Sequence, residues 1–527
     1  MTRSRAWAIL LFLLILIPSA QFAWRNRDMP QFAYLHDDGI LFTSAKSLAN
    51  GNGYRIASMP ENPPQTKQPP LYPLLLSLVW LWNPVFPQNL TLATLLCWLT
   101  LISCLAAAAA YYKTSGIAPG ERWGLLALLG LSPFMILFGC TMFSEVLFTT
   151  FVLLALFFAQ KEGGRAFVLA LIAANCAYLT RTAGIALLVA LPVLWISQKQ
   201  FRRAVYFLAS TIPCAVLWTV WSAMERPATA DATLLYYVDY VRFWKMNVGL
   251  DNLPVLLWKN ADQLLYGMGA LVVPKVADML PLKILTEVIG VAMISGTIRL
   301  TRRGVMVDYA WFAFFSCLML LVWHYPPNER FVLPLFPLLI AGLSAEVHHF
   351  AGMLRPAFRH KDWSQRIVAG GMAMGITVIL LAALSLQMFM SFFLMHENAR
   401  QQRLALKDRI NAYQWIARNI PPSASILSYD DALLYLYSGR RGNYLPLMPR
   451  WWYAEDHAQI TASYRDIAEY CRSRGLSYVY FTDQDLSRET GDEDRRTVAA
   501  LLRDNRQLVP LYHSGIGTVF RIQPTSP

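Results

Sequence analysis

Charged side chains are scarce in this chain, and their scarcity argues against a soluble protein. Only 15% of the 527 residues are Asp, Glu, Lys or Arg, whereas 56% are hydrophobic. Soluble domains carry about 25% charged residues. The 17 Trp, 24 Tyr and 28 Phe residues supply the aromatic content that is typical of membrane–water interfaces. The composition therefore predicts a membrane protein.

The sequence also lacks the patterns of disulfide-rich and nucleic-acid-binding proteins. None of the seven cysteines forms a CxxC pair and six lie in apolar stretches, so we interpret them as small buried hydrophobic residues. There is no zinc-finger spacing, RNA-binding motif or basic helix with interleaved aromatic residues. The net charge of +13 therefore does not indicate binding to nucleic acid, and many of the Lys and Arg residues lie in short loops between apolar stretches.

The alternation of apolar stretches with basic loops predicts a polytopic α-helical membrane protein. A spanning helix takes roughly 20 apolar residues, which gives about 11 spans, with about 11–13 possible. The range depends on Leu71–Trp82 and Leu264–Val273, which could instead be interfacial or re-entrant. The basic clusters fall at alternate loops, which the positive-inside rule assigns to the cytoplasm. With the N-terminus inside, the C-terminal region is then expected outside the membrane.

The N-terminus has a basic start, an apolar stretch from Trp7 to about Phe22, and the sequence PSAQFA. This pattern fits either a cleaved signal peptide or a retained signal anchor. We favour the anchor, because the many spans that follow need no separate signal. The expected location is the inner membrane of the cell.

The sequence divides into two expected domains. Residues 1–397 form the transmembrane catalytic domain, and residues 26–90 form its first outer loop. Residues 398–527 are more polar and alternate between helical and strand patterns, as in "DIAEYCRSRGLSYVYFTD", where Gly475 follows the helix. "LVPLYHSGIGTVFRI" predicts two strands around a glycine turn. We therefore expect a small C-terminal extracytoplasmic α/β domain.

An acidic pair, Asp37 and Asp38, lies in the first outer loop, soon after the first apolar stretch. Charged groups close to hydrocarbon cost several kcal/mol, so acids held at the interface indicate a site. The pair could also be a solvated helix start, where Asp is favoured. Other ionisable residues fall on the same expected side of the membrane: Lys67, Glu145, Arg181, His324, Glu329 and Arg330. Acids among cations on one face favour a site for an anionic lipid headgroup.

These residues stand in motifs that resemble those of the GT-C superfamily of integral-membrane glycosyltransferases. The resemblance is to the branch of protein O-mannosyltransferases, the lipid A aminoarabinose transferase and the RgtA/B/C/D-like sugar transferases. It covers residues 1 to about 395. The matching residues, in chain order, are Asp37, Asp38, Thr43, Ala45, Lys46, Leu48, Gly51, Gly53, Tyr54, Lys67–Pro73, Ser144-Glu145, Leu179–Arg181 and Arg330–Pro337. The second acid is Asp38, where many relatives carry Glu.

The resemblance implies a fold of GT-C type and a hexosyl- or pentosyltransferase that inverts the configuration at the anomeric carbon. The sugar would pass from a polyprenyl-phosphate donor to a hydroxyl of a glycolipid, polysaccharide or protein on the outer face of the bilayer, as in lipopolysaccharide or protein glycosylation. The implied catalytic residues are Asp37, Asp38 and Glu145, with Asp37 as general base.

The same resemblance assigns the remaining candidates. The implied donor-phosphate ligands are Arg330, Lys67 and Arg181, since guanidinium groups bind phosphate bidentately. Candidate contacts to the acceptor or the sugar are His36, Tyr72, His324 and Glu329. No cofactor is certain. A divalent metal is possible, since some relatives hold one and others do not, and its ligands here would be Asp38 and Glu145.

Two alternatives remain open at this point. A transporter or flippase of lipid-linked sugars would also be polytopic with outward charges, but it would more often show internal repeats, and none is found. An O-antigen polymerase or ligase would be built on a large late outer loop with essential Arg and His. The acidic pair in the first loop argues against that enzyme.

Overall fold

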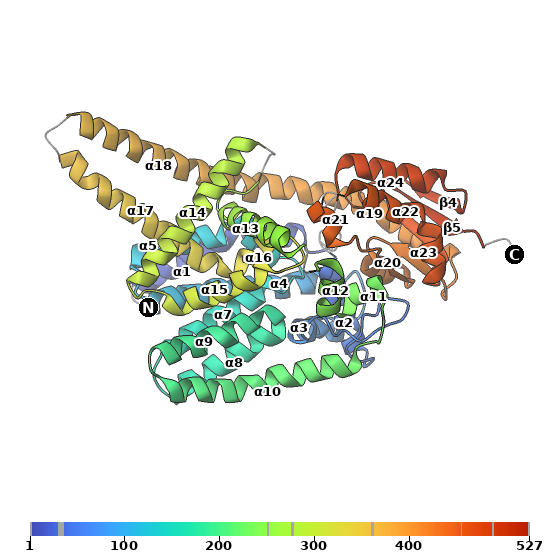
Figure 1. Ribbon diagram of the computed structural model, residues 1–527, viewed down its shortest axis with the longest axis horizontal. Coiled ribbons are helices and arrows are strands. Elements are labelled where there is room, and N and C mark those ends of the chain that lie inside the picture. The colour runs from blue at the N-terminus through green and yellow to red at the C-terminus, as the bar shows by residue number, and fades with distance from the viewer. Residues whose placement is uncertain are drawn as a thin grey trace. The chain divides into compact units, whose positions relative to one another are not determined.

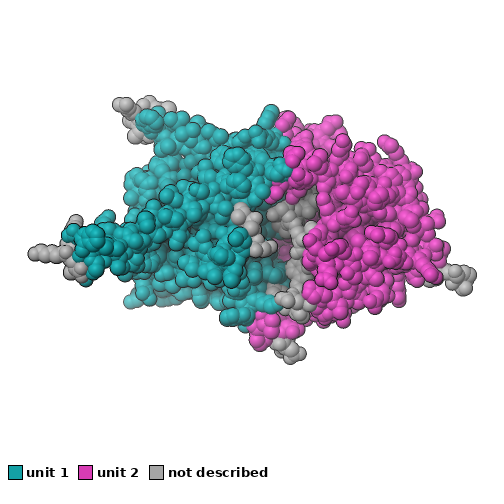
Figure 2. All heavy atoms as spheres, turned by 90° about the horizontal axis from the view of Figure 1, so that it is seen from above, with its two compact units in different colours: residues 1–26, 95–217, 257–397 teal, residues 27–94, 218–256, 398–527 magenta. Residues whose placement is uncertain are grey.

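The computed structural model describes residues 3–29, 36–249, 252–275, 279–359, 363–454, 456–486 and 490–524. The chain divides into two compact units, coloured separately in Figure 2. Unit 1 comprises residues 1–26, 95–217 and 257–397, and unit 2 comprises residues 27–94, 218–256 and 398–527. Unit 2 therefore combines three segments that are distant in sequence. The division into two sequence-continuous domains stays a prediction.

The structure confirms a helical, multi-pass membrane protein. Six helices are long and apolar enough to cross a membrane, or seven if a bent pair is one span, within the described residues. The six are Ala6–Arg25 of α1 (Arg3–Arg25), α4 (Leu90–Thr114), α10 (Phe201–Glu225), α14 (Leu280–Arg302), Glu329–Pro356, and Trp363–Asn419. Glu329–Pro356 contains α16 (Glu329–Val332), η3 (Leu333–Leu335) and most of α17 (Phe336–Arg359). Trp363–Asn419 contains α18 (Trp363–Phe389), a π-helix (Met390–Leu394) and α19 (Met395–Asn419).

Several further apolar helices are shorter than a full span: α3 (Leu71–Trp82), α7 (Glu145–Ala159), α8 (Gly164–Thr180), η2 (Thr182–Gly184) with α9 (Ile185–Ser197), and α15 (Val307–Leu321). At 1.5 Å per residue, a helix the length of α7 reaches roughly 22 Å, whereas the hydrocarbon core is about 30 Å thick. The number of crossings therefore stays a prediction. The helix α13 (Leu253–Ala270) contains most of the second ambiguous segment.

One apolar stretch that the sequence predicts as a single span, Trp123–Phe143, is broken in the structure. It forms α5 (Pro119–Gly130) and α6 (Pro133–Gly139), which are bent by 61° relative to each other. Both helices begin at a proline. Proline suits the first turn of a helix but cannot donate the backbone hydrogen bond that a continuing helix needs. The second proline therefore accounts for the break.

The helices α14 and α17 of unit 1 pack at very close range through two glycines. A Cβ atom added to Gly296 would lie 1.8 Å from the Gly342 carbonyl oxygen, and one added to Gly342 would lie 2.4 Å from Thr297 Oγ1. Small residues at such a crossing let two backbones approach each other in the absence of a hydrophobic driving force between helices.

The C-terminal part of unit 2 contains a five-stranded mixed sheet in the order β2-β1-β3-β5-β4. Strands β4 and β5 are labelled in Figure 1. The strands are β1 (Ser425–Ser428), β2 (Arg441–Asn443), β3 (Tyr478–Thr482), β4 (Leu508–Ser514) and β5 (Gly517–Ile522). Strand β1 pairs in parallel with β2 and β3, whereas β5 pairs antiparallel with β3 and β4. The predicted α/β domain is therefore confirmed, including the two strands around the glycine turn.

Short helices accompany this sheet: α20 (Asp431–Ser438), α21 (Pro449–Ala454), α22 (His457–Arg465), α23 (Ile467–Ser473) and α24 (Asp492–Asp504). The helix α23 ends just before Gly475, which has a φ of 67° and takes the left-handed conformation at little steric cost. The core includes Ile467, Cys471, Val479 and Val498, each at most 1% exposed. Cys471, the one cysteine outside the apolar stretches, is thus a small buried core residue as well.

The rest of unit 2 contains α2 (Asp37–Ala49), α3, α11 (Ala232–Val238) and α12 (Tyr240–Asn247). A small hydrophobic core joins its three segments, with Ile40 of α2, Tyr237 of α11 and Tyr444 after β2 among its buried members. The acidic pair occupies the first turn of α2. This core therefore supports the helix that carries the two acids.

Candidate active site

Glu145 lies between two arginines in unit 1. Its Oε1 atom accepts a hydrogen bond of 2.6 Å from Arg181 Nη1 and a second bond from Arg330 Nε. The Glu145 side chain is 1% exposed, and those of Arg181 and Arg330 are 20% and 8% exposed. We call these three residues the Glu145 group. The structure thus brings together three of the residues that the sequence singles out.

Helix ends position the first two members of this group. Glu145 is the first residue of α7, and Arg181 is the residue that follows α8. The Ser144 hydroxyl accepts a further hydrogen bond of 3.0 Å from Arg181. After Arg181 the chain turns through η2 into α9, and a Cβ atom on Gly184 would lie 2.6 Å from the Tyr178 backbone. Only glycine fits this turn without displacing the end of α8.

Arg330 is fixed by the short helix α16. Asn328 caps that helix, and its Oδ1 atom accepts a hydrogen bond of 3.1 Å from the Arg330 backbone N–H. The guanidinium lies over the Phe143 ring, with Cζ 4.6 Å from the ring centre. A guanidinium stacked on a ring and paired with a carboxylate has few free rotamers, so the site is preorganised.

The Glu145 group carries an excess of positive charge. Two guanidinium groups and one carboxylate sum to a net charge of +1 in a largely buried place. The second oxygen of Glu145, Oε2, accepts no hydrogen bond from any residue that the structure describes. Guanidinium groups held in a buried place are suited to binding an anion such as a phosphate, because they donate charge-assisted, often bidentate hydrogen bonds.

The acidic pair lies in unit 2, where its two members differ in exposure. Asp38 is fully buried, and its Oδ1 atom accepts a hydrogen bond of 2.7 Å from the Gly39 N–H. Asp37 is partly exposed, and its Oδ1 atom lies 3.5 Å from the Gln68 side-chain amide nitrogen. Asp37 is therefore the acid with more access to a substrate.

His36, which immediately precedes the pair, is held by the C-terminal part of unit 2. Its Nε2 atom pairs with Oδ1 of Asp431, the first residue of α20. Burial acts to lower the pKa of His36, but the charge and hydrogen bond of Asp431 act to raise it, and its pKa lies above the usual 6.5. The rings of Tyr236, Tyr237 and Tyr444 surround it at 6.0, 5.4 and 5.2 Å between centres.

Lys67 is fixed by the segment that contains α11 and α12. Its Nζ atom donates a hydrogen bond of 2.8 Å to the Tyr236 carbonyl oxygen and lies 4.3 Å from the centre of the Tyr236 ring. The Tyr240 ring lies on it as well, at 4.8 Å. Tyr236 therefore contacts both His36 and Lys67.

The remaining candidates are placed as follows. Tyr72 is buried in α3, and His324 is buried against the rings of Trp323 and Tyr325, 4.5 and 4.7 Å away. Glu329 is the partly exposed first residue of α16, next to Arg330. Their contacts to acceptor or sugar stay predictions.

Two further expectations concern how the candidates combine. In the part of the chain that the structure describes, no group of three or more His, Cys, Asp and Glu residues could hold a metal ion. The predicted metal ligands, Asp38 and Glu145, belong to different units. The convergence of the Glu145 group with the acidic pair stays a prediction, for the same reason.

We call residues 36–38, at the start of α2, the acidic loop. Sequence reasoning missed the residues that pack against it: Tyr236, Tyr237, Asp431 and Tyr444. They come from segments far from the loop in sequence, and no local motif marks them. The only local signal is the unusual density of aromatic and acidic residues in "LLYYVDY" and "SYDDALLYLY".

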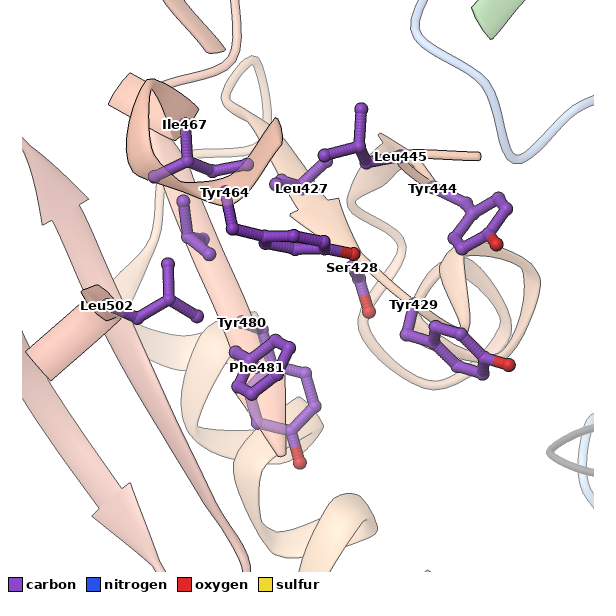
Figure 3. A pocket seen from close by; sticks show the side chains of 11 residues that line it. Leu427, Ser428, Tyr429, Tyr444, Leu445, Tyr464, Ile467, Tyr480, Phe481 and Leu502 are labelled. Atoms are coloured by element: carbon purple, nitrogen blue, oxygen red, sulfur yellow. The ribbon is translucent and has the colours of Figure 1, made fainter. Parts of the chain in front are cut away.

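A small cavity lies in the C-terminal part of unit 2 (Figure 3). Its lining is rich in aromatic residues, with Tyr429 and Tyr444 together at one edge, their ring centres 5.3 Å apart. Tyr444 also packs against His36, so one side chain serves both the cavity wall and the acidic loop.

Comparison with solved structures shows the same fold. ArnT from Cupriavidus metallidurans bound to undecaprenyl phosphate matches with a TM-score of 0.53 and 12% identity, over 98% of each chain. The apo oligosaccharyltransferase of Archaeoglobus fulgidus matches with a TM-score of 0.56 and 12% identity, over 97% of this chain and 74% of that one. AglB from the same organism, in complex with an inhibitory peptide and a dolichol-phosphate, gives 0.53 and 11%, over 92% and 70%.

No family model matches the chain, and no curated protein matches it in sequence. The likeness therefore rests on three-dimensional structure, and it extends over nearly the whole chain. The protein is a multi-pass membrane protein that shares the fold of ArnT and of the archaeal oligosaccharyltransferase.

Proposed function

We propose that this protein is a glycosyltransferase that moves a sugar from a polyprenyl-phosphate donor to an acceptor hydroxyl on the outer face of the membrane. The observation that carries the proposal is the buried Glu145 group, which holds two guanidinium groups side by side on one carboxylate oxygen. Guanidinium groups bind phosphate bidentately, so the group is suited to a lipid phosphate. The structural likeness to a protein with bound undecaprenyl phosphate supports the same donor class. The outer face follows from the distribution of basic loops.

The proposed reaction is a single displacement. The acceptor oxygen attacks the anomeric carbon. The bond between this carbon and the phosphate oxygen breaks, and polyprenyl phosphate leaves with the electron pair. Asp37 takes the acceptor proton as general base, since it is the partly exposed member of the acidic pair. Asp38, buried beside it, orients the first turn of α2. One base and no second nucleophile imply inversion at the anomeric carbon.

The cations would act on the leaving group. Arg330 and Arg181 stabilise the charge that grows on the phosphate as the glycosidic bond breaks, and Lys67 assists. Glu145 holds both guanidinium groups in place before the donor arrives.

The test is sugar transfer by the purified protein in liposomes, from radiolabelled polyprenyl-phosphate sugars to envelope extracts as acceptors. The wild type should transfer label, and Asp37→Asn should lower kcat by about 100-fold or more, because general-base catalysis contributes about 10²–10⁴-fold. Asp492→Asn, an 80% exposed carboxylate, is the matched control and should keep wild-type activity. Lipid movement across the bilayer without transfer by the wild type would favour a flippase instead.

A further inference from the structure

The C-terminal part of unit 2 supplies a side chain to the start of the acidic loop. Asp431 pairs with His36 across 395 residues of sequence, and the Asp431 side chain is fully buried. His36 directly precedes Asp37 and stands at the N-terminal end of α2. The contact therefore ties α20 to the turn of helix that carries both acids.

Further contacts restrict the His36 ring on several sides. The Tyr237 hydroxyl lies 3.4 Å from Nε2, and it accepts a hydrogen bond of 3.0 Å from the Tyr444 backbone N–H. The hydrophobic core that contains Ile40 lies one helical turn further along α2. The charged groups that act on His36 are Asp431, Asp37 and Asp430. The ring is thus confined by elements from all three segments of unit 2.

This pairing is not the arrangement that stability alone would favour. The second oxygen of Asp431 and Nδ1 of His36 are buried and accept or donate no hydrogen bond among the described residues. A buried ion pair with unsatisfied atoms is often no more stable than a well-packed apolar pair of the same volume. A role in fixing geometry accounts for the pair better than a role in stability does.

We propose that Asp431 is a positioning residue of the transfer reaction, which acts through His36 to fix the direction of the Asp37 and Asp38 carboxylates. This inference rests on the proposed function. On this proposal, the C-terminal α/β part of the chain contributes to kcat through Asp431. The acidic loop alone would not hold its base in the reactive direction, since His36 would be free to rotate about its side-chain bonds.

The experiment is a double-mutant cycle on the full-length protein in liposomes, with Asp431→Asn, His36→Gln and the double variant. Each single change should lower kcat about 10–100-fold, because catalysis depends on positioning within a fraction of an ångström. The KM for the polyprenyl-phosphate donor should stay within about three-fold, since the phosphate ligands are other residues. The double variant should be no slower than the slower single variant, because both changes break one contact.

The matched control is His457→Gln, which breaks another His–Asp pair, with Asp494 at 2.7 Å, on a 66% exposed side chain. It should leave kcat within about two-fold of wild type, as surface substitutions usually do. A merely structural role for Asp431 predicts a lower unfolding temperature with an unchanged kcat for the folded protein. If Asp431→Asn reduces the yield of folded protein, His36→Gln tests the same contact, because His36 is the more exposed of the two partners.

The outcomes separate the two proposals. If the wild type transfers sugar while Asp431→Asn keeps more than half of kcat, or the two single effects multiply in the double variant, Asp431 is not a positioning residue and the proposed function stands. If the wild type transfers no sugar from any polyprenyl-phosphate donor, the proposed function is wrong and the positioning role is wrong with it.

Discussion

Arg181 at the end of α8 and Glu145 at the start of α7 lie 2.6 Å apart, so the two ends of this helical hairpin are joined by an ion pair. Arg330, far along the chain, binds the same oxygen of Glu145. The carboxylate is almost fully buried, so its charge is compensated by these two cations rather than by water. Changes at the three positions should therefore have different and separable effects.

Arg330→Ala should weaken binding of polyprenyl phosphate by about 10–100-fold, since a charge-assisted contact in a buried site is worth about 1.5–3 kcal/mol. Arg330→Lys should recover only part of this loss, because an ammonium group cannot bind phosphate as a planar fork. Binding is measured with a labelled lipid phosphate in detergent. Arg302→Ala, at an exposed position of α14, is the control. Near-normal affinity in Arg330→Ala would remove this residue from the donor site.

Glu145→Gln should have the opposite effect on binding. It raises the net charge of the group from +1 to +2, so lipid phosphate should bind as tightly as in the wild type or more tightly. Turnover should nevertheless fall by about 10–100-fold, because the two guanidinium groups lose the carboxylate that orients them. Binding and kcat are measured on the same preparation. A ten-fold weaker affinity would show that Glu145 itself contributes to holding the donor.

Gly184→Ala should disturb the site without changing any charged residue. The added methyl group would lie 2.6 Å from the Tyr178 backbone, so the turn after Arg181 must shift. We expect a loss of stability of about 1–3 kcal/mol, as is typical of overpacking, together with reduced transfer. Gly124→Ala in α5 is the control, because nothing lies within 4 Å of its added Cβ atom. Equal unfolding temperatures for the two variants would contradict this account of the turn.

A buried ion cluster makes the stability of the C-terminal sheet depend on pH. Arg409 of α19 pairs with Asp430 and, at 3.1 Å, with Asp485. Burial raises the pKa of Asp485 to about 6. A raised carboxylate pKa favours the folded state when the group is protonated, so this contribution is complete below about pH 4 and is lost as the pH rises through 6.

Asp485→Asn should therefore flatten the pH dependence between about pH 4 and 7 and raise stability at pH 7, by at most about 3 kcal/mol. Thermal unfolding across this range, followed by near-ultraviolet circular dichroism, measures the effect. Asp483→Asn, an exposed carboxylate two residues earlier, serves as the control. A variant with the same slope as the wild type would show that Asp485 does not titrate in this range.

The helices and strands that depend on local patterns were predictable from the sequence. The apolar stretches Thr91–Tyr112, Val146–Ala159 and Ile284–Ile298 predict helices that the structure shows as α4, α7 and α14. The glycine turn predicts the β4–β5 pair. The break between α5 and α6 was not predicted, because Pro133 lies inside an otherwise continuous apolar stretch and hydropathy does not register backbone donors. Hydropathy does not predict the length of a helix either, since a helix ends where the backbone turns.

The candidate site shows the same division. The motifs marked Glu145, Arg181 and Arg330, and these three side chains meet in unit 1. The supporting residues in unit 2 could not be found in this way, because they contact the acidic loop from segments that are far from it in sequence. Asp431, for example, has no meaning for the acidic loop until the chain has folded.

The three segments of unit 2 are separated in sequence by segments of unit 1, so they are synthesised at different times. The acidic loop leaves the ribosome early, whereas Asp431, the partner of His36, is translated 395 residues later. The acidic loop therefore lacks this partner while most of the membrane helices are inserted. A nascent chain that terminates between Arg330 and α20 would carry both acids and all three members of the Glu145 group, yet would lack the Asp431 side chain that pairs with His36. Premature termination would thus yield a membrane-inserted product with an unsupported acidic loop.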